Sequence, residues 1–467
     1  MIGLKLSKKV LNELLGKGVE FSEIFVQNRI LNNLKLEDSK IESSSSGFEL
    51  GCGLRIISGD STYYAYVDSL SSDKILNAAK VLRSAVCSKL RKKTLDLSER
   101  KKPSEKAIDR HPFSVIQEDK KSFLLEVDFA ARNHNPAIIQ VTSNLSDLVE
   151  NTYIANSEGF FCSDELVMVY LSVNAVARKG SEIRTGYKSI AKTKGYEIFF
   201  IKKPSDISIE ASTIAVKMLD AENAPVGTMP VVLGPAFGGV IFHEACGHGL
   251  EADAVLKDAS VYKGKIGKEI ASPMVTAVDD ATIPYHWGSY AFDDEGYPSE
   301  KNVLIENGIL RSYIFDYKTA KKMKMKQTGN GRRQSFRDIP IPRMSNTYIE
   351  NGSEDPSVII KSVKSGVYAK EFAGGQVDPA TGDFVFGISE GYIIENGNIC
   401  APIKNATLIG NGPEILKKID AVGNDLDFAP GFCGKGGQSV SNEVGQPTIL
   451  VSEITVGGTK VQENDNE

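Results

Sequence analysis

The chain has 467 residues, 41% of them hydrophobic, and its 55 Lys and Arg residues against 60 Asp and Glu residues give a formal net charge of -5. This composition is that of an ordinary globular protein and excludes disordered and fibrous classes. At about 150 residues per domain, the length predicts two or three domains. The slight acidity argues against direct nucleic-acid binding, because nucleic-acid surfaces cluster positive charge.

The sequence offers no sign of membrane insertion or secretion. No apolar run reaches the roughly 18 residues of a membrane span, and residues 1–20 predict an amphipathic helix rather than a signal peptide. The six cysteines lack the dense spacing of a secreted disulfide scaffold. We therefore expect a cytoplasmic protein without a membrane partner, in which most cysteines are small buried hydrophobes.

The N-terminal part of the chain predicts a mixture of helices and strands. Residues 48–56 alternate apolar and polar side chains, which indicates a half-buried strand, and residues 58–60 supply a turn into a second strand around Tyr64. Apolar residues at helical spacing then predict a helix that ends near Val86 and packs on the sheet. Residues 89–110 are charged, and their interleaved acidic residues favour an exposed connection over a basic binding patch.

The pattern of the following residues places a domain boundary near 220. Residues 138–200 return to period two and predict a long antiparallel meander, and residues 204–220 predict a helix. We therefore expect an N-terminal α+β domain at 1–220, with an antiparallel sheet, and a second domain at 221–467.

The C-terminal domain is expected to be mainly β and to carry the helix of a metal site. It is rich in glycine and in short strand and turn signals, including hairpin turns at Asn307–Gly308 and Asn396–Gly397. No repeat of fixed period is found, and residues 461–467 predict a frayed tail. The fold class predicted for the whole chain is α+β.

A short apolar strand at 231–233 leads into a predicted helix that carries His243, Glu244 and His248 as H-E-x-x-x-H. Two imidazoles beside a carboxylate indicate a zinc hydrolase. Five residues of a straight α-helix turn through about 500°, which leaves the two imidazoles about 140° apart and unable to bind one ion. Because glycines flank His248, we predict a distortion at 245–249, either a π-type turn or an end of the helix, that brings the imidazoles together.

The metal hypothesis needs a base and a third ligand. Glu244 is placed to act as the general base on a metal-activated water. If no metal binds, the alternative is that the two histidines form a hydrogen-bonded, half-buried pair. Candidate third ligands are the nearby Cys246, Glu251 and Asp253, or the distant Cys433 in the glycine-rich PGFCGKGGQ, which we interpret as an open loop. Cys246 is expected to face the packed side of the helix.

Six blocks in order resemble the TldD/PmbA metalloprotease family, specifically its TldD-like, metal-motif-bearing branch: GGVIFHEACGHGLEAD, FDDEGYPSEKNVLIENGIL, TGNGRRQSF, PIPRMSNTYIENG, GGQVDPATGDFVFGISEGYIIENG and GFCGKGGQ. Residues 21–68 also resemble the family's N-terminal domain. The resemblance implies a zinc metalloprotease in which His243, His248 and Cys433 bind Zn²⁺ and Glu244 is the catalytic base. Cys246 fills a motif position that is often apolar, which leaves open a competing thiol ligand or an oxidation-sensitive site.

The resemblance also implies an assembly and a substrate class. Members of this branch are similar to one half of a pair with a metal-free PmbA/TldE-like paralogue, so we expect such a heterodimer or a homodimer, enclosing a chamber for short or unfolded peptides. An extended substrate is hypothesised to add as a strand to a sheet edge near His243. The family name has been attached to modulation of DNA gyrase, but the acidic sequence supports no direct DNA binding.

The leading prediction is a zinc-dependent metalloprotease that hydrolyses peptide bonds in short or unfolded polypeptides. The alternative is a non-catalytic, zinc-stabilised peptide-binding or assembly module, which a fourth ligand such as Cys246 would favour, because structural zinc sites are closed by four protein ligands. A regulator of nucleic-acid enzymes, the third possibility, lacks a basic patch and would need salt-dependent DNA binding for support.

Other charged and aromatic residues are weighed against structural roles. Arg332, Arg333 and Arg343 are candidate contacts to a substrate carboxylate or to transition-state charge, with surface or interdomain salt bridges as an equal alternative. The acidic cluster at 293–295 indicates an ordinary loop, because it lacks the ligand spacing of a calcium site. The pair His286 and Trp287 favours a packed or partner-facing loop over oxyanion stabilisation.

Overall fold

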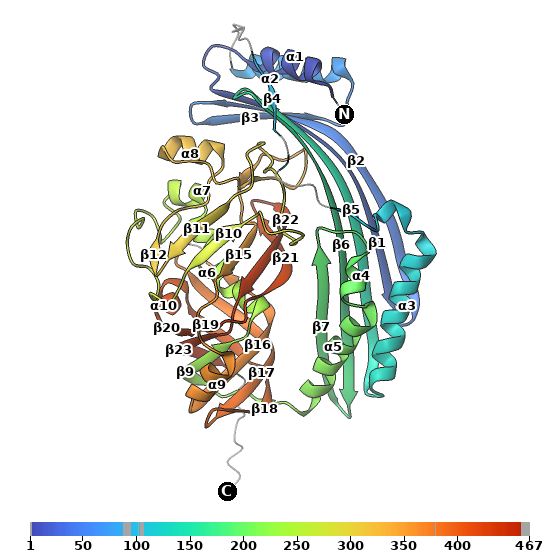
Figure 1. The fold of residues 1–467 in the computed structure, drawn as a ribbon, viewed down its shortest axis with the longest axis vertical. Helices are drawn as coiled ribbons and strands as arrows, with labels where there is room; N and C mark the ends of the chain where they lie inside the picture. The colour runs from blue at the N-terminus through green and yellow to red at the C-terminus, as the bar shows by residue number, and fades with distance from the viewer. Residues whose placement is uncertain (1, 87–94, 101, 103–106, 379, 459–467) are drawn as a thin grey trace.

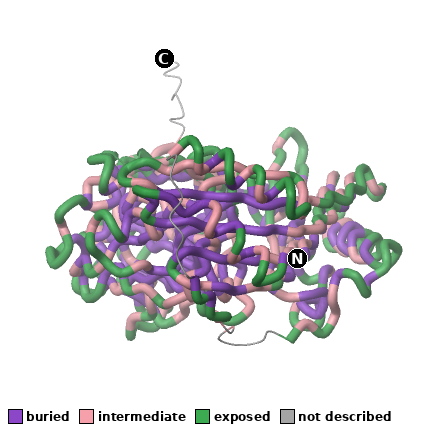
Figure 2. Tube along the Cα trace, turned by 90° about the horizontal axis from the view of Figure 1, so that it is seen from above, coloured by how far each residue is buried: buried purple, intermediate pink, exposed green. Residues whose placement is uncertain are grey.

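A computed structural model describes residues 2–86, 95–100, 102, 107–378 and 380–458. Long, curved strands from the N-terminal half form one sheet, and the C-terminal half lies against one face of it (Figure 1). Figure 2 shows buried segments running through the interior of the molecule, with exposed residues concentrated in its outer turns and helices. Within the described residues, no helix is both long and apolar enough to cross a membrane.

The N-terminal sheet has seven strands in the order β3-β2-β1-β5-β6-β4, with β7 also paired to β6. All pairings are antiparallel except that of β4 with β6. The predicted hairpin and meander are confirmed. The strands are β1 (Phe21–Glu37), β2 (Lys40–Ser58), β3 (Ser61–Val67), β4 (Ser98–Glu99), β5 (Ile138–Asn156), β6 (Phe160–Lys179) and β7 (Glu182–Lys192).

Helices cover the face of this sheet that points away from the C-terminal half. The helices α1 and α2 share a core with one end of the sheet, and α3 and α5 share a second core with the other end. The helices predicted near the N-terminus, before Val86 and at 204–220 are present. Their bounds are α1 (Leu4–Leu14), α2 (Ser72–Val86), α3 (Gln117–His134), α4 (Ile198–Ile201) and α5 (Pro204–Lys217), with 3-10 turns η1 (Pro112–Ser114) and η2 (Met218–Asp220).

The strand predicted to be half-buried is buried on both faces over much of its length. Cys52, Leu54 and Ile56 pack beneath α1 and α2, while the side chain of Arg55, on the opposite face, is only 1% exposed because it pairs with Glu295 of the C-terminal half. The single-face expectation was wrong here, since sequence alternation reports the helix-covered face but not the domain packed against the other.

The charged connection predicted at 89–110 is only partly described, because residues 89–94, 101 and 103–106 lie outside the described residues. Its described portion is not simply an exposed loop. Leu95 and Leu97 are buried in the core under α1 and α2, and the short strand β4 pairs with β6. The abundance of charge concealed these two alternating leucines. The expected tail at 461–467 also lies outside the described residues.

The C-terminal half contains a six-stranded sheet in the order β12-β11-β10-β15-β22-β21 and a closed ring in the order β16-β9-β23-β19-β17, because β17 also pairs with β16. The strands β18, β8 and β20 attach to this ring, and β13 and β14 form a separate pair. The expected α+β class is therefore confirmed. These strands are β8 (Glu222–Asn223), β9 (Gly227–Leu233), β10 (Ala277–Asp280), β11 (Lys301–Glu306), β12 (Ile309–Leu310), β13 (Gly331–Arg332), β14 (Ile341–Pro342), β15 (Asn346–Ile349), β16 (Ser365–Val377), β17 (Asp383–Glu395), β18 (Asn398–Lys404), β19 (Thr407–Asn411), β20 (Ile419–Val422), β21 (Asp427–Lys435), β22 (Gln438–Gln446) and β23 (Ile449–Gly457).

Both predicted hairpin turns are confirmed. Asn307 and Gly308 have φ of 49° and 82°, and Asn396 and Gly397 have φ of 48° and 76°. Left-handed conformations at both central positions define the type I′ turn that Asn-Gly favours. The expected boundary near 220 falls between η2 and β8.

Short helices lie between and around the C-terminal sheets. The helix α6 contacts strands of both the six-stranded sheet and the closed ring, so it occupies the layer between them (Figure 1). The remaining elements are η3 (Ala236–Gly239), α6 (Val240–Ala245), η4 (Gly247–Leu250), α7 (Ala252–Leu256), α8 (Tyr317–Met323), α9 (Pro356–Ser362) and α10 (Gly412–Lys417).

Candidate metal centre

The segment that carries the two histidines is broken where the spacing predicted it. The helix α6 ends at Ala245, Cys246 has φ of -130° and ψ of -47°, and the chain resumes as the 3-10 turn η4. This break turns the imidazoles of His243 and His248 toward each other, with ring centroids 5.1 Å apart. The distortion predicted at 245–249 is therefore confirmed, and it takes the form of an interrupted helix rather than a π-turn.

Close packing explains why glycines surround this break. A Cβ atom on Gly247 would lie 2.2 Å from Sδ of Met344, and one on Gly239, at the start of α6, would lie 2.6 Å from the carbonyl oxygen of Gly445 in β22. Larger residues would push the segment away from its neighbours, since Cβ contacts below 3.0 Å are essentially never found. Gly239 therefore allows the start of α6 to lie directly against β22, and Gly247 leaves room for the side chain of Met344 beside the break.

The third donor comes from the neighbouring strand β21. Sγ of Cys433 lies 3.4 Å from Nε2 of His248, and one donor atom each from His243, His248 and Cys433 all lie within 4.8 Å of one another. Tetrahedral zinc with Zn–N of about 2.1 Å and Zn–S of about 2.3 Å places its ligand atoms about 3.5 Å apart. The three side chains thus fit an ion of this size after a small shortening of the distances between their donor atoms.

Charge interactions also favour the thiolate form of Cys433. Burial alone would raise the pKa of its thiol, but the neighbouring imidazoles of His243 and His248 outweigh burial and lower this pKa to about 4. Burial lowers the pKa of His248, yet Glu251 and Cys433 together hold that pKa well above its ordinary value. The sulfur is therefore a thiolate near neutral pH, the form that binds metal.

Glu244 is the carboxylate beside these donors that remains open to solvent. Its side chain is 30% exposed and its Oε2 lies 3.6 Å from Nε2 of His248. The residues His243 and Cys433 are 2% and 4% exposed. A carboxylate at the edge of an otherwise buried donor group is within reach of a water that approaches the group from solvent, as a general base must be.

The nearer candidate ligands have other partners. Cys246 is fully buried and its Sγ accepts a hydrogen bond from the Tyr262 hydroxyl at 3.0 Å; burial raises the pKa of this thiol to about 12. Glu251 contacts the other ring nitrogen of His248, at 2.9 Å from Nδ1, and Asp253 pairs with Lys435 at 2.6 Å. Cys246 therefore faces the packed side, as expected.

The structure places Cys433 in a strand, so the interpretation of its segment as an open loop was wrong. Cys433 pairs with Val440 in the β21–β22 hairpin, whose turn contains Gly436 and Gly437 at φ of 59° and 77°. The many glycines masked the strand because they serve the turn. As a consequence, Lys435 and Cys433 lie on the same face of β21, two residues apart.

The three candidate substrate arginines are buried and engaged with the protein. Arg332 donates to the carbonyl oxygens of Met344 at 2.7 Å and Ser441 at 2.8 Å. Arg343 donates to the carbonyl oxygens of Cys433 and Gln438, so both arginines hold the β21–β22 hairpin. Arg333 pairs with Glu23 of the N-terminal half. The contacts of Arg333 match the interdomain alternative, and a substrate contact stays a prediction for all three.

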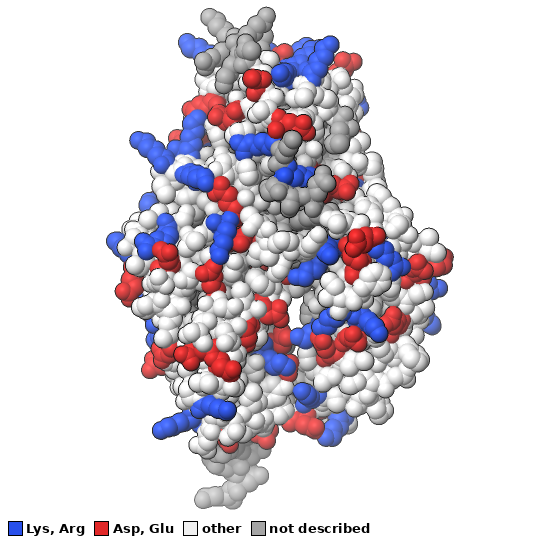
Figure 3. Space-filling model, in the orientation of Figure 1, with Lys and Arg blue, Asp and Glu red and all other residues white. Residues whose placement is uncertain are grey.

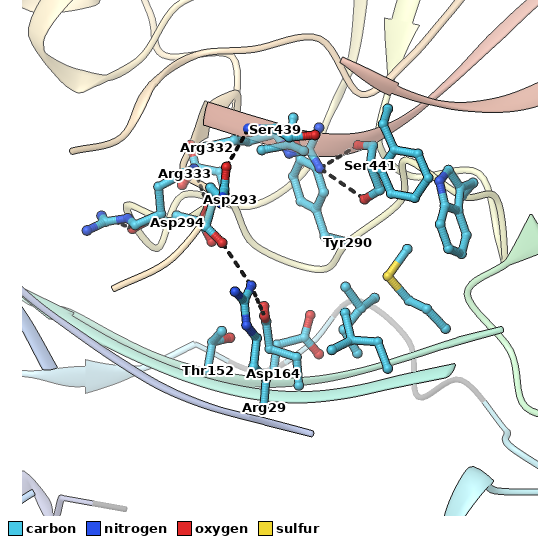
Figure 4. Close-up of a pocket in the computed structure, with 18 of the residues that line it drawn as sticks. Arg29, Thr152, Asp164, Tyr290, Asp293, Asp294, Arg332, Arg333, Ser439 and Ser441 are labelled. Atoms are coloured by element: carbon cyan, nitrogen blue, oxygen red, sulfur yellow. Dashed lines mark hydrogen bonds and ion pairs between the residues drawn. The ribbon is translucent and has the colours of Figure 1, made fainter. Parts of the chain in front are cut away.

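A cavity of about 320 Å³ lies between the N-terminal sheet and the C-terminal half. Figure 4 shows Arg29, Thr152 and Asp164 reaching into it from the sheet, opposite Tyr290, Arg332 and Ser441. Its walls also include the apolar side chains of Leu148, Leu166, Met168, Trp287 and Phe432. Successive side chains of a strand point to opposite faces, so Phe432 of β21 faces this cavity and the next residue, Cys433, faces the other side. The β21–β22 hairpin therefore separates the cavity from the donor group.

The other residues singled out in the sequence have structural contacts. Trp287 packs in a small cluster with Met168 and Ala191 of the N-terminal sheet, and Nδ1 of His286 lies 2.6 Å from Oε2 of Glu443, as a packed loop predicts. In the acidic cluster, Oδ1 of Asp293 accepts backbone hydrogen bonds from Glu295 and Tyr297. On the face drawn in Figure 3, acidic and basic side chains are interspersed.

Sequence comparison supports the class of site that this donor set defines, a metal centre of the kind found in hydrolases. Three family descriptions match in chain order: "PmbA/TldA metallopeptidase domain 1" at residues 22–86, "PmbA/TldA metallopeptidase central domain" at 110–219 and "PmbA/TldA metallopeptidase C-terminal domain" at 226–458. The chain belongs to the TldD/PmbA metallopeptidase family.

Individual relatives agree with this assignment. The chain is 38% identical to a metalloprotease TldD homolog of Buchnera aphidicola subsp. Acyrthosiphon pisum, over 96% of this chain and 95% of that one. It is 38% identical to a metalloprotease TldD homolog of Haemophilus influenzae, over 95% and 94% of the two chains. A zinc metalloprotease TldD homolog of Saccharolobus solfataricus is 32% identical over 62% of this chain and 64% of its own.

Solved structures share the fold. A putative modulator of a DNA gyrase from Thermotoga maritima aligns with a TM-score of 0.81 at 21% identity, covering 97% of this chain and 99% of that one. TldE from Thermococcus kodakarensis aligns with a TM-score of 0.78 at 21% identity and the same coverage. These likenesses extend over both halves of the molecule and support the fold alone.

Proposed function

We propose that this protein is a zinc-dependent metallopeptidase that hydrolyses peptide bonds in short or unfolded polypeptides. The observation that carries the proposal is the convergence of His243, His248 and Cys433, with all donor atoms within 4.8 Å, beside the partly exposed carboxylate of Glu244. Two imidazoles and a thiolate are ligands that zinc prefers, and three protein ligands leave a fourth position for reactants.

The residues of the chain would divide the reaction between them. Zinc held by His243, His248 and Cys433 would supply a Lewis acid. Glu244 would accept a proton from the attacking water and deliver it to the leaving amine. The hydrophobic core around α6 would keep the donors in place and limit solvent access, since His243 is only 2% exposed.

The proposed substrate class follows from access to the site. The donors are nearly buried, so a folded protein surface would not reach them, whereas an extended chain would. The strand β21, which carries Cys433, is the last strand of its sheet, and an extended peptide pairing with such an edge would use main-chain groups with little regard to side chains. This supports, but does not test, the strand-addition hypothesis.

The proposed assembly is a homodimer or a heterodimer with a metal-free, PmbA/TldE-like paralogue. The support for such a paralogue is the fold shared with TldE from Thermococcus kodakarensis. The alternative function, a non-catalytic zinc-stabilised module, requires a fourth protein ligand. Cys246, its expected source, is hydrogen-bonded to Tyr262, and no observation among the described residues favours that alternative.

Metal-dependent cleavage of a defined substrate pool tests the proposal. The full chain, with and without a co-purified partner, would be assayed on unstructured peptides and on a stably folded protein, before and after removal of metal by a chelator. The proposal predicts about one zinc per chain, cleavage of the peptides only, loss of cleavage after chelation and recovery with Zn²⁺. Zinc binding without cleavage, even with a partner present, would favour the non-catalytic module.

A further inference from the structure

We infer that Glu251 is a positioning residue that fixes the imidazole of His248 for metal binding, and that Lys435 holds Glu251 in place from the strand that carries Cys433. This inference rests on the proposed function, because it assigns a role around the same metal centre. Neither residue contacts the reacting atoms in the proposed scheme. Their role is to set the direction of the His248 ring and the nitrogen that it turns toward the metal.

The contacts of Glu251 are those of a buried acceptor. It is 0% exposed, and its Oε2 lies 2.9 Å from Nδ1 of His248 and 3.0 Å from Nζ of Lys435. Its other oxygen, Oε1, is buried and has no hydrogen-bond partner among the described residues. The contacts of this carboxylate are therefore concentrated on the histidine and the lysine.

Lys435 joins the two segments that supply the metal ligands. It lies two residues after Cys433 in β21, whereas Glu251 and Asp253 follow η4 in the chain. Its Nζ contacts Oδ1 of Asp253 at 2.6 Å and the carbonyl oxygen of Pro342 at 3.0 Å, in addition to Glu251. One ammonium group thus ties the His248 segment to the Cys433 strand.

The hydrogen bond to Glu251 determines which nitrogen of His248 is free. A carboxylate accepts hydrogen bonds, so Nδ1 must carry the proton that it donates. In the neutral ring, the form that binds metal, Nε2 then presents its lone pair, and Nε2 is the nitrogen that lies 3.4 Å from Sγ of Cys433. A carboxylate behind a metal-binding imidazole also makes the imidazole a stronger ligand, and removing such a partner typically weakens metal binding 10–100-fold.

The second histidine is held differently, which makes the effect of Glu251 specific. Nδ1 of His243 lies 3.4 Å from the amide nitrogen of Asn442 in β22, and no carboxylate contacts this ring among the described residues. A long contact to a neutral amide constrains a ring less than a charged hydrogen bond does. Loss of Glu251 should therefore affect one ligand and leave the other unchanged.

The test measures zinc affinity, by competition with a chromogenic chelator, in the full chain and in the Glu251→Gln and Glu251→Asp variants. We expect both variants to bind zinc about 10–100-fold more weakly than the wild type. In the Co²⁺-loaded variants, the sulfur-to-metal charge-transfer band should persist while the visible bands of tetrahedral Co²⁺ weaken, because Cys433 remains and His248 is misoriented. Glu251→Asp keeps the charge beside Lys435, so it reports on His248 even if Glu251→Gln does not fold.

Glu295→Gln provides the matched control. Glu295 is an equally buried carboxylate, with 1% of its side chain exposed, and it pairs with Arg55 at 2.7 Å. Among the described residues, no hydrogen bond or ion pair joins Glu295 to His243, His248 or Cys433. This variant should lose thermal stability while keeping wild-type zinc affinity. Wild-type affinity in both Glu251 variants, or equal weakening in Glu295→Gln, would overturn the inference while leaving the proposed function intact. A wild-type chain that binds no zinc would overturn both.

Discussion

The ion network between the two halves of the molecule and the candidate metal centre both bury charged side chains, but they differ in how those charges are satisfied. Arg55 lies 2.6 Å from Glu23 and 2.7 Å from Glu295, Arg333 also pairs with Glu23, and each of these side chains is at most 1% exposed. In this network, each buried charge is neutralised by an ion pair with an opposite charge. In the candidate metal centre, three electron-pair donors converge, and this convergence, rather than burial of charge, indicates chemistry.

Of the substitutions that test this comparison, that of Cys433 should have the largest effect, a loss of zinc affinity. Cys433→Ser keeps the shape of the side chain but replaces a thiolate with a hydroxyl that stays protonated at neutral pH. We expect zinc affinity to fall about 100-fold or more, since loss of a direct ligand should exceed the 10–100-fold effect of losing an outer partner. Chelator competition measures it, and the exposed Cys400 supplies the control variant Cys400→Ser, which should bind zinc as the wild type does.

Substitution of Arg55 should disrupt the buried ion network and lower the stability of the protein. Arg55→Met leaves Glu23 and Glu295 buried without a shared cation, so the free energy of unfolding should fall by about 3–5 kcal/mol, with wild-type zinc affinity in the folded variant. Denaturant titration and zinc competition on the same sample measure both quantities. Lys179→Met, which removes an ion pair whose side chains are 67% and 69% exposed, should change stability by less than about 1 kcal/mol. Equal losses in the two variants would contradict the comparison.

A smaller effect is expected from Glu150, which lines the interdomain cavity. Burial, with a contribution from Asp294, raises the pKa of Glu150 to about 7. A carboxyl whose folded-state pKa is raised stabilises the fold fully below its unfolded pKa of about 4.3, and that contribution is lost as pH rises toward 7. Glu150→Gln should therefore reduce the loss of stability between pH 5 and pH 8 by about 1–2 kcal/mol. Parallel pH profiles for both proteins would show that Glu150 is not the group responsible.

Much of the fold could be predicted from local sequence patterns. Asn-Gly pairs specify type I′ turns through their own backbone preferences, and the H-E-x-x-x-H spacing required the break found at Cys246. The burial of Arg55 and of Leu95 could not be predicted in this way, because it depends on domains and strands distant in the sequence.

The candidate site likewise has parts that local sequence predicts and parts that depend on segments distant in the chain. Its histidines are close in sequence, and Glu251 is three residues from His248, but the position of Lys435 relative to His248 depends on β21 lying beside η4. Sequence alone gave Cys433 as one of four candidate third ligands, and the family resemblance singled it out, but its glycine-rich surroundings concealed the strand. Period-two spacing from Cys433 would have placed Lys435 on the same face, had the strand been recognised.

Substitution of Glu244 tests most directly whether the converging donors form a catalytic rather than a structural centre. Zinc content and the rate of peptide cleavage would be measured on the same preparations of wild type, Glu244→Ala and Cys433→Ala, with any co-purified partner present. The proposed mechanism predicts about one zinc in both wild type and Glu244→Ala, weakened zinc binding in Cys433→Ala, and cleavage by the wild type alone. Normal cleavage by zinc-loaded Glu244→Ala would contradict it.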